Sequence, residues 1–416
     1  MPVTIRDVRV IMTAPPQDQK GEASGKAGKE IYAGPNLVVV RIDTSDAGLY
    51  GLGCATYTQR AAAVKTAVET YLKPLILGRN VDEIEDIWHI CMVNPYWRNG
   101  PVLNNAVSGV DQALWDIKGK RAGMPVYQLL GGKCREGVLA YRHADGRDPV
   151  EVEDNVRRFM EQGFTHVRIQ QGLYGGRDQR LHQTINPREG AYYDPKQYMK
   201  TTVGLFEHIR SQLGDQVELL HDIHERLAPQ YAVQLAKALE PYDLFFLEDA
   251  LPPEQVAYFR QIRAQSAIPL AMGELFVNPT EWMPLISERL IDYIRCHISQ
   301  IGGLTPARKL AAVCEAFGLR TAWHGPPDVS PIGHAANIHL DLATRNFGIQ
   351  EWPHISEQLR EVFPGTPETR DGYIYLHEAP GWGVEIDEKA AAKYPCVHEP
   401  PRWTAARLPD GTSVTP

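Results

Sequence analysis

From about residue 137 onward, short apolar segments alternate with amphipathic helical patterns, and this rhythm constrains the fold more than any other feature of the chain. There are eight such segments, and most of them start about 24 to 28 residues after the one before. Eight strand–helix units of this length predict an α/β protein with a (β/α)8 barrel, for which a doubly wound sheet is the structural alternative. The expected strands are residues 138–143, 166–170, 217–222, 244–248, 269–274, 293–298, 320–324 and 347–351.

The part of the chain before the barrel has a different pattern. Two strand-like segments, at residues 3–12 and 37–42, precede a series of amphipathic helical patterns. We therefore predict an α+β capping domain over residues 1–130 and a barrel domain over residues 131–380. The Pro- and charge-rich tail, residues 381–416, is expected to pack back on the capping domain.

Composition narrows the choice of partners and compartment. Among 416 residues, 43 are Lys or Arg and 51 are Asp or Glu, so the net charge of −8 argues against nucleic acid or an anionic membrane as the partner. No apolar run is long enough to span a bilayer, and Arg6 and Asp7 interrupt the N-terminal apolar stretch that a signal peptide requires. Six widely spaced cysteines without a CxxC motif are typical of reduced thiols, so we expect a cytoplasmic protein.

Three acidic residues end successive predicted strands. Asp222, Glu248 and Glu274 close the third, fourth and fifth strands, 26 and 26 residues apart, so their carboxylates should meet at the barrel mouth. Each alone is compatible with a helix cap or a surface charge. Three carboxylates about 4 Å apart, however, repel by roughly 4 kcal/mol per pair and require a cation, and an all-oxygen ligand set favours Mg²⁺. Asp249 should point the other way along its strand and serve a structural role.

The other strand ends supply candidate acids, bases and substrate ligands, namely His143, Arg168, His224, Arg295, His324 and Glu351. His224 follows Asp222 by two residues, so on an extended strand it lies on the same side as the metal ligand. His324 and Glu351 are suited to form hydrogen bonds with substrate hydroxyls. Arg168 and Arg295 are suited to neutralise a substrate carboxylate or orient a base, and a salt bridge inside the barrel is the alternative for Arg295.

A family resemblance supports this interpretation. A capping domain and a barrel with Asp, Glu and Glu on strands three to five resemble the enolase superfamily. More closely, the segments that look like its mannonate dehydratase subgroup are PYWRNGPV, ALWDIKGKRAGMPVYQLLGG, YRHADG, LLHDIHERLAP, FLEDALPPE, MGELF, HGPPDVSP, NFGIQE and GWGVEIDEKAAAKYP.

The resemblance implies a reaction. Mg²⁺ on Asp222, Glu248 and Glu274 would bind the carboxylate of a sugar acid and stabilise the enediolate formed when the α-proton leaves. Loss of the β-hydroxyl, protonated by His224, then gives a 2-keto-3-deoxy acid. Arg168 matches the family's arginine that pairs with a tyrosine base.

Further pocket positions and departures bear on the substrate. The positions that match the family's pocket are His143, Arg295, His324, Glu351 and Trp97. The family's base tyrosine is Arg180 here, which leaves Tyr174 as the candidate base, with Tyr192 or Tyr193 as alternatives.

Two other pocket positions differ from the family's pattern. Thr58 replaces an asparagine, and Pro326 stands where efficient mannonate dehydratases have alanine. These changes predict weak, promiscuous dehydration of D-mannonate or D-gluconate, or a different aldonic acid as the true substrate, by a homo-oligomer whose only partner is a small sugar acid. The alternatives are a racemase or epimerase on the same metal, and a non-catalytic regulatory homologue that keeps the metal site.

Overall fold

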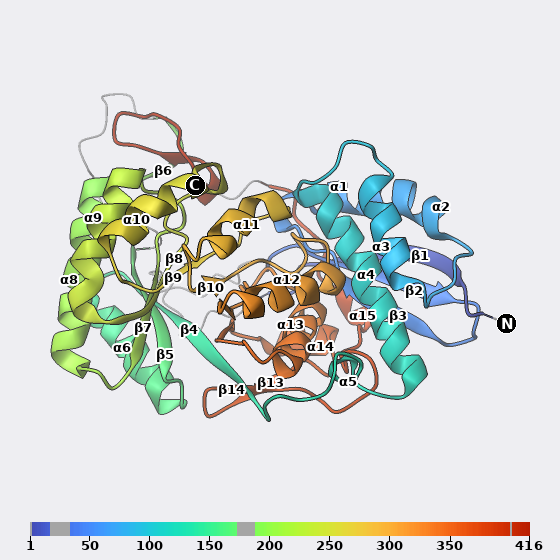
Figure 1. The fold of residues 1–416 in the computed structure, drawn as a ribbon. Helices are drawn as coiled ribbons and strands as arrows, with labels where there is room; N and C mark the ends of the chain where they lie inside the picture. Colours follow the sequence, from blue (N-terminus) through green and yellow to red (C-terminus); the bar gives the residue numbers. More distant parts are fainter. Residues whose placement is uncertain (1, 17–33, 173–187, 400–401) are drawn as a thin grey trace.

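The computed structural model describes residues 2–16, 34–172, 188–399 and 402–416. It has a capping region at one end and a barrel at the other (Figure 1). None of the described helices is both long and apolar enough to cross a membrane.

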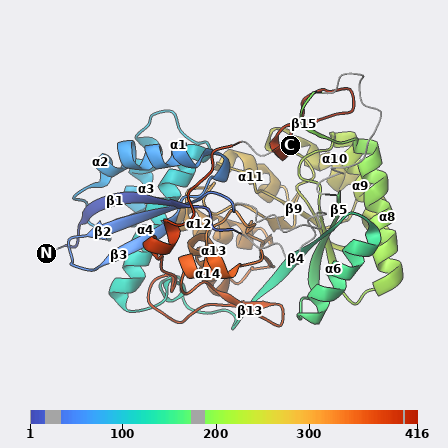
Figure 2. The ribbon, with the colours of Figure 1, turned by 180° about the vertical axis from the view of Figure 1, so that it is seen from behind.

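The capping region is a three-stranded antiparallel sheet covered by helices (Figure 2). Its strands are β1 (Ile5–Thr13), β2 (Leu37–Thr44) and β3 (Tyr50–Cys54), and its helices are α1 (Ala61–Thr66), α2 (Lys73–Ile76), α3 (Ile84–Val93) and α4 (Pro101–Ala122). The long helix α4 lies directly on β3. A Cβ atom at Gly51 would stand 2.0 Å from the Ala113 carbonyl oxygen, and one at Gly53 would stand 2.0 Å from that of Gly109. The two glycines therefore allow this close approach.

The eight predicted barrel strands are all present and run parallel, so the predicted (β/α)8 barrel is confirmed. Neighbouring strands pair in the order β11, β10, β9, β8, β7, β5, β4 and β12, and a bridge from Thr321 to Phe347 closes the ring. The strands are β4 (Val138–Gly146), β5 (His166–Gln171), β7 (Glu218–Asp222), β8 (Leu244–Glu248), β9 (Leu270–Met272), β10 (Tyr293–Ile294), β11 (Arg320–Thr321) and β12 (Gln350–Glu351).

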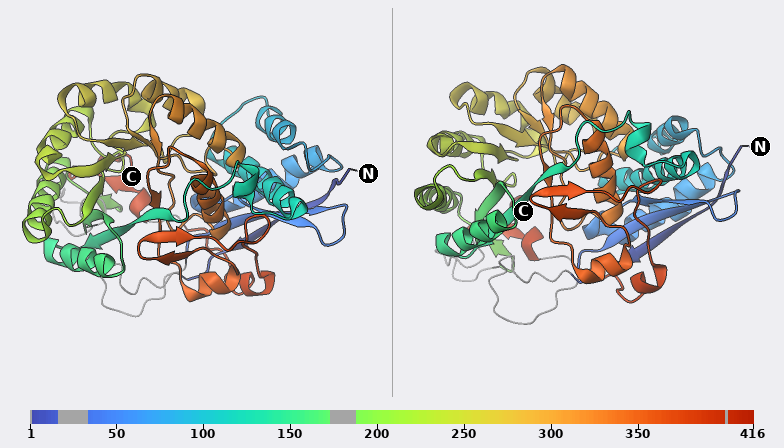
Figure 3. Two further views of the ribbon diagram at one scale, coloured as in Figure 1. Left: turned by 60° about the horizontal axis from the view of Figure 1, so that its bottom comes forward. Right: turned by 90° about the horizontal axis from the view of Figure 1, so that it is seen from below.

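Helices surround the strands, as the views along the barrel show (Figure 3). They are α6 (Pro149–Glu161), α8 (Pro195–Leu213), α9 (Pro229–Leu239), α10 (Phe259–Gln265), α11 (Pro279–Ser287), α12 (Leu304–Ala316) and α13 (Pro331–Ala343). The short helix α5 (Val126–Leu129) lies against α4 and α13, and α14 (Glu357–Val362) follows β12. Several begin with proline behind a polar cap; Asp148, for example, accepts a hydrogen bond from the Glu151 amide at 2.9 Å.

The inside of the barrel is filled by its own apolar cluster. The cluster consists of Tyr141, Leu220, Phe246, Ala271, Ala322 and Ile349, each from a different strand or strand extension. An antiparallel hairpin, β13 (Glu368–Arg370) and β14 (Tyr373–Tyr375), adds to the edge of β4. The packed interior leaves the carboxyl ends of the strands as the place for a site.

The tail divides between the two regions. Helix α15 (Glu388–Ala391) packs on β1, where Arg9 forms an ion pair with Glu388 at 2.6 Å. By contrast, β15 (Ala406–Arg407) pairs with β6 (Ala191–Tyr192) on the barrel side. The expectation that the whole tail returns to the capping domain is therefore wrong for residues 402–416, because their strand partner belongs to the insertion after β5.

Candidate active site

The carboxylates predicted at the strand ends lie in two adjoining groups. Asp222 ends β7 and Glu248 ends β8, and their ligand oxygens lie with that of Asp249 within 4.8 Å of one another. Glu274 comes two residues after β9, and groups in the same way with His224 and Glu225. All of these residues are at least 90% buried except His224, whose side chain is 13% exposed.

Asp249 departs from its predicted orientation. Its backbone φ of 41° lies in the left-handed region, which breaks the alternation of side chains along the strand. The Asp249 carboxylate consequently turns toward the Asp222 and Glu248 carboxylates, and its Oδ1 accepts a hydrogen bond from the Gly273 amide at 2.8 Å. The prediction that it points away is wrong.

Two buried arginines balance part of this negative charge. Arg168 Nη1 donates to Asp222 Oδ2 at 2.9 Å. Arg295 is fully buried, and its Nη2 lies 2.8 Å from Glu248 Oε1 and 2.8 Å from Glu351 Oε2. The structure thus places Arg295 in the salt bridge inside the barrel that was the alternative to a substrate contact.

The surroundings of four clustered acids raise their pKa values. Burial raises the pKa of Glu248, Glu274 and Glu225 well above their usual range, and the neighbouring carboxylates raise it further. Burial likewise raises the pKa of Asp249 to about 7. The cluster therefore favours either bound protons or a bound cation that would keep the carboxylates ionised.

The donor set fits a hard divalent cation. Within the described residues, both carboxylate oxygens of Glu248 are buried without a hydrogen-bond partner, although Arg295 lies close to one of them. Buried oxygens with unused lone pairs, in a set without cysteine, are the ligands that Mg²⁺ prefers.

His224 stands beside the cluster, but not by the route that the sequence predicted. Both His224 and Glu225 have a φ of 55°, so the chain turns sharply after Asp222 instead of continuing extended. The backbone amide of His224 donates to Asp222 Oδ1 at 2.6 Å. The imidazole Nε2 of His224 lies 3.4 Å from Glu274 Oε1. The turn therefore still brings the imidazole to the carboxylates.

The end of the tail completes the surroundings of His224. The Pro416 carbonyl oxygen lies 3.2 Å from His224 Nδ1, and the Trp403 ring meets the imidazole edge-on at 5.9 Å between centroids. In Figure 3 the C-terminus accordingly falls over the ring of strands. Sequence analysis missed both residues, because no local pattern indicates a contact across about 190 positions.

A second group of predicted residues adjoins the cluster through Glu274. Glu351 Oε1 lies 2.8 Å from His143 Nε2, and His324 Nε2 lies 3.2 Å from Glu274 Oε2. Burial would raise the pKa of Glu351, but Arg295 and the two histidines together hold it well below its usual range. The structure thus brings together His143, His324 and Glu351 with the carboxylates, as predicted.

Trp97 and Thr58 make their described contacts away from the cluster, whereas Pro326 follows Gly325, whose amide donates to Glu351 Oε2 at 2.9 Å. Trp97 is 83% exposed and packs edge-on against Tyr96. Thr58 hydrogen bonds to the Asn36 carbonyl at 2.9 Å in the capping region. Pro326 lies in the loop after His324, and its carbonyl accepts from the Val329 amide at 3.1 Å.

The candidate bases are only partly described. Tyr174 and Arg180 lie outside the described residues. The hydroxyl of Tyr192 donates to the Arg188 carbonyl and that of Tyr193 to the Arg226 carbonyl, each at 2.9 Å. Because both hydroxyls bind backbone oxygens, the structure pairs neither of them with Arg168.

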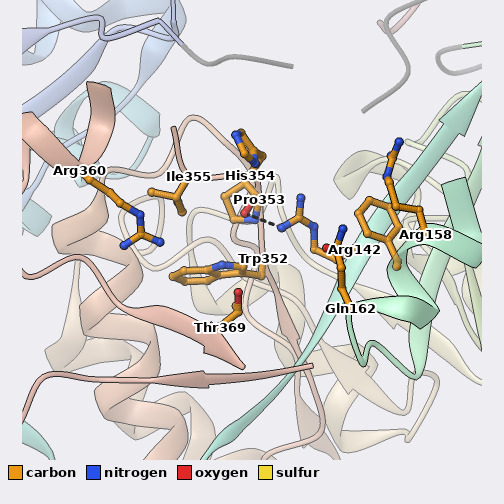
Figure 4. A pocket seen from close by; sticks show the side chains of 10 residues that line it. Arg142, Arg158, Gln162, Trp352, Pro353, His354, Ile355, Arg360 and Thr369 are labelled. Atoms are coloured by element: carbon orange, nitrogen blue, oxygen red, sulfur yellow. Dashed lines mark hydrogen bonds between the residues drawn. The ribbon is translucent and has the colours of Figure 1, made fainter. Parts of the chain in front are cut away.

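A cavity of about 350 Å³ lies on the outer side of the barrel, away from this cluster. Its walls include Arg142, Trp352 and Arg360, and Arg142 Nη1 donates to the Pro353 carbonyl at 3.2 Å (Figure 4). Arg142 immediately precedes His143 on β4, so the alternation of the strand turns it to the opposite face. None of the clustered carboxylates lines this cavity.

The comparison with protein families identifies the class of protein. Residues 151–390 match the family Enolase C-terminal domain-like, and residues 31–131 match the Mandelate racemase / muconate lactonizing enzyme N-terminal domain. A putative mandelate racemase/muconate lactonizing enzyme from Labrenzia alexandrii shares the fold, with a TM-score of 0.81 at 24% identity over 95% of this chain and 96% of the other. The predicted resemblance to the enolase superfamily is confirmed.

More similar relatives define the family within that class. D-galactonate dehydratase family members from Musicola paradisiaca and Pantoea ananatis are 52% and 53% identical to this chain over 99% of both chains in each pair. An enolase from Pantoea ananatis, crystallised with bound D-gluconate and Mg, has a TM-score of 0.91 at 52% identity and covers 100% of both chains. The chain therefore belongs to the D-galactonate dehydratase family.

Proposed function

We propose that this chain is a Mg²⁺-dependent dehydratase that converts an aldonic acid into a 2-keto-3-deoxy acid. The observation that carries the proposal is the meeting of buried strand-end carboxylates with His224 and Arg168 at one end of the barrel. The Pantoea ananatis enolase that holds D-gluconate and Mg supports the same ligand chemistry.

Asp222, Glu248 and Glu274 are the residues that would hold the cation, with Asp249 close behind them. When bound, Mg²⁺ would stabilise the negative charge that develops on the substrate carboxylate as the α-carbon loses its proton. Arg168 keeps the Asp222 carboxylate in place through its 2.9 Å hydrogen bond. This pairing fixes the geometry of the strand ends before the substrate arrives.

The elimination requires one base and one acid. The base takes the proton from the α-carbon, the electron pair forms the α,β double bond, and the β-hydroxyl leaves as water after receiving a proton. We assign the acid to His224, whose Nε2 faces the carboxylate cluster. Tyr174 remains the candidate base. The resulting enol then tautomerises to the 2-keto-3-deoxy acid.

The substrate hydroxyls would bind a second group of side chains at the barrel mouth. His143, His324 and Glu351 form this polar group, to which Thr58, Trp97 and Pro326 remain proposed additions. Arg295 holds Glu351 in this group, because its Nη2 lies 2.8 Å from Glu351 Oε2. These contacts favour an acid with a chain of hydroxyls over a simple hydroxy acid.

The substrate that we propose is D-mannonate or D-gluconate, turned over with low efficiency. Pro326 restricts the loop that follows His324, and Thr58 replaces an amide, so substrate alignment should be imperfect. Because the relatives are named as members of the D-galactonate dehydratase family, D-galactonate belongs among the candidates.

The test is a panel of aldonic and uronic acids with the purified chain and Mg²⁺, followed by detection of 2-keto-3-deoxy product. We expect slow product formation from D-mannonate or D-gluconate, abolished by EDTA. Isomerised substrate without keto product would instead establish a racemase or epimerase, and binding without any product would establish a non-catalytic homologue.

Three further expectations remain predictions. The division into a capping domain of residues 1–130 and a barrel of residues 131–380 is supported by an apolar cluster that lies wholly within residues 3–117, while a larger cluster joins Leu37, Val39 and Leu52 to the barrel. A homo-oligomer and a cytoplasmic location are likewise proposed, and light scattering and cell fractionation would test them.

A further inference from the structure

Gln170 on β5 is a buried amide whose hydrogen-bonding capacity is unused. Its side chain is 1% exposed, and within the described part of the chain neither its amide oxygen nor its amide nitrogen has a hydrogen-bond partner. Buried polar groups in folded proteins are nearly always paired, because leaving them unpaired in a dry interior is costly. An amide with both ends unsatisfied therefore needs an explanation.

The position of Gln170 points to the barrel mouth. It follows Arg168 by two residues on the same strand, so the two side chains share a face, and Arg168 reaches Asp222 on that face. The intervening Ile169 belongs to the core outside the barrel. In the register with β4, Arg168 is paired with His143 and Gln170 with Asp145. Gln170 thus forms the next layer toward the mouth, above the arginine.

The chemistry of the side chain selects the kind of group that it would bind. A neutral amide offers both donors and an acceptor, and a hydroxyl likewise donates and accepts. The charged groups below, Arg168 and the clustered carboxylates, are matched to a cation and a carboxylate instead. We infer that Gln170 binds a hydroxyl on the carbon chain of the sugar acid and helps to select it, an inference that rests on the function proposed above.

This assignment predicts opposite effects on stability and on binding. Replacing Gln170 with Met removes the unpaired polar atoms at similar volume, so the free protein should melt about 1 to 3 °C higher. The same variant should bind the sugar acid about tenfold more weakly, since a hydrogen bond to the ligand is lost. A glutamine that merely supports the fold would show a lower melting temperature and unchanged binding.

Gln112 provides the matched control. It is also fully buried, but its Oε1 accepts from the Cys54 amide at 3.1 Å and its Nε2 donates to Ser108 at 2.9 Å. Gln112→Met should therefore lower the melting temperature and leave the affinity for the sugar acid unchanged. If that control does not fold, Gln170→Met is compared directly with the unsubstituted chain by the same two measurements.

The experiment is calorimetric titration of the Mg²⁺-loaded full chain with D-gluconate and D-mannonate, in a His224→Asn background that suppresses turnover, together with melting curves. Deoxy analogues that lack one hydroxyl add a second comparison. The unsubstituted Gln170 background should discriminate against one analogue by about tenfold, and the Gln170→Met variant should not.

The outcomes distinguish a failure of the inference about Gln170 from a failure of the proposed dehydratase function. Tighter or equal binding by Gln170→Met, a fall in its melting temperature, or undiminished discrimination among the deoxy analogues overturns the role of Gln170 while leaving the dehydratase intact. If the chain with Gln170 in place binds no sugar acid at all, the proposed function fails first, and the role of Gln170 fails with it.

Discussion

Replacing Glu248 with Gln should separate metal binding from folding. Glu248 is fully buried, and its carboxylate lies within 4.8 Å of those of Asp222 and Asp249. At an effective dielectric of 20, each such pair repels by about 3.5 kcal/mol when ionised, or about 7 kcal/mol for both. Against this stands the attraction to Arg295 at 2.8 Å, about 6 kcal/mol on the same scale.

These opposing contributions nearly cancel, and the raised pKa of Glu248 favours its neutral form in EDTA, so Glu248→Gln should change the free energy of unfolding there by only about 1 kcal/mol. The response to Mg²⁺ should differ much more. At a concentration one hundred times its dissociation constant, a bound ligand stabilises the folded protein by about 2.7 kcal/mol. For 416 residues this corresponds to a rise of about 3 °C in melting temperature, which the variant should lose along with most of its activity.

The assay is differential scanning calorimetry of both proteins in EDTA and in excess Mg²⁺. Glu161→Gln, on the exposed surface of α6, serves as the matched control and should keep the full response to the metal. An equal rise in melting temperature for Glu248→Gln and the parent would refute the assignment of Glu248 as a metal ligand. Undiminished product formation by the variant would refute the metal-dependent mechanism.

Three further predictions concern the acid, the tail and the pH dependence. His224→Asn should keep the Mg²⁺-induced rise in melting temperature but lose most dehydration of D-mannonate or D-gluconate in a product assay. Trp403→Ala removes the ring that packs on His224, so kcat should fall about tenfold or more while Mg²⁺ affinity stays unchanged. Burial lowers the pKa of His339 to about 4, below an unfolded value of about 6.5, so the unfolded chain binds more protons in this range. The free energy of unfolding should therefore fall as the pH drops from about 6.5 to 4, by up to about 3 kcal/mol from this group. Urea unfolding across this range should show a shallower fall for His339→Gln.

The strand order and the convergence of the strand-end carboxylates could be predicted because their signals are local. Eight apolar segments at nearly regular spacing predict a barrel, and an acid at the same place in successive units predicts convergence. Asp222 and Glu248 stand at the strand ends as expected. The position of Gln170 on the same strand face as Arg168 could also have been predicted, because Gln170 follows Arg168 by two residues on a strand.

The orientation of side chains just beyond the strands was less predictable. Asp249 and His224 both have positive φ angles, which cannot be predicted from these residue types in the sequence. The alternation rule therefore placed Asp249 on the wrong side, and placed His224 correctly for a reason that the structure does not support. Only the packing around these turns, which involves several strands, determines their direction.

Residues that are distant in the sequence but contact the site could not be predicted from local patterns either. His224 is contacted by Pro416 and Trp403, which belong to the tail and not to the barrel. The proposed metal ligands on β7 and β8 are held by hydrogen bonds between barrel strands, whereas the proposed acid, His224, is held partly by a segment that adds to β6. Changes in the tail or in the insertion after β5 can therefore alter proton delivery while the carboxylates stay in place. This separation explains why the fold and the convergence of the carboxylates could be predicted from the strand ends, whereas the contacts of Trp403 and Pro416 with His224 come from a segment without periodicity.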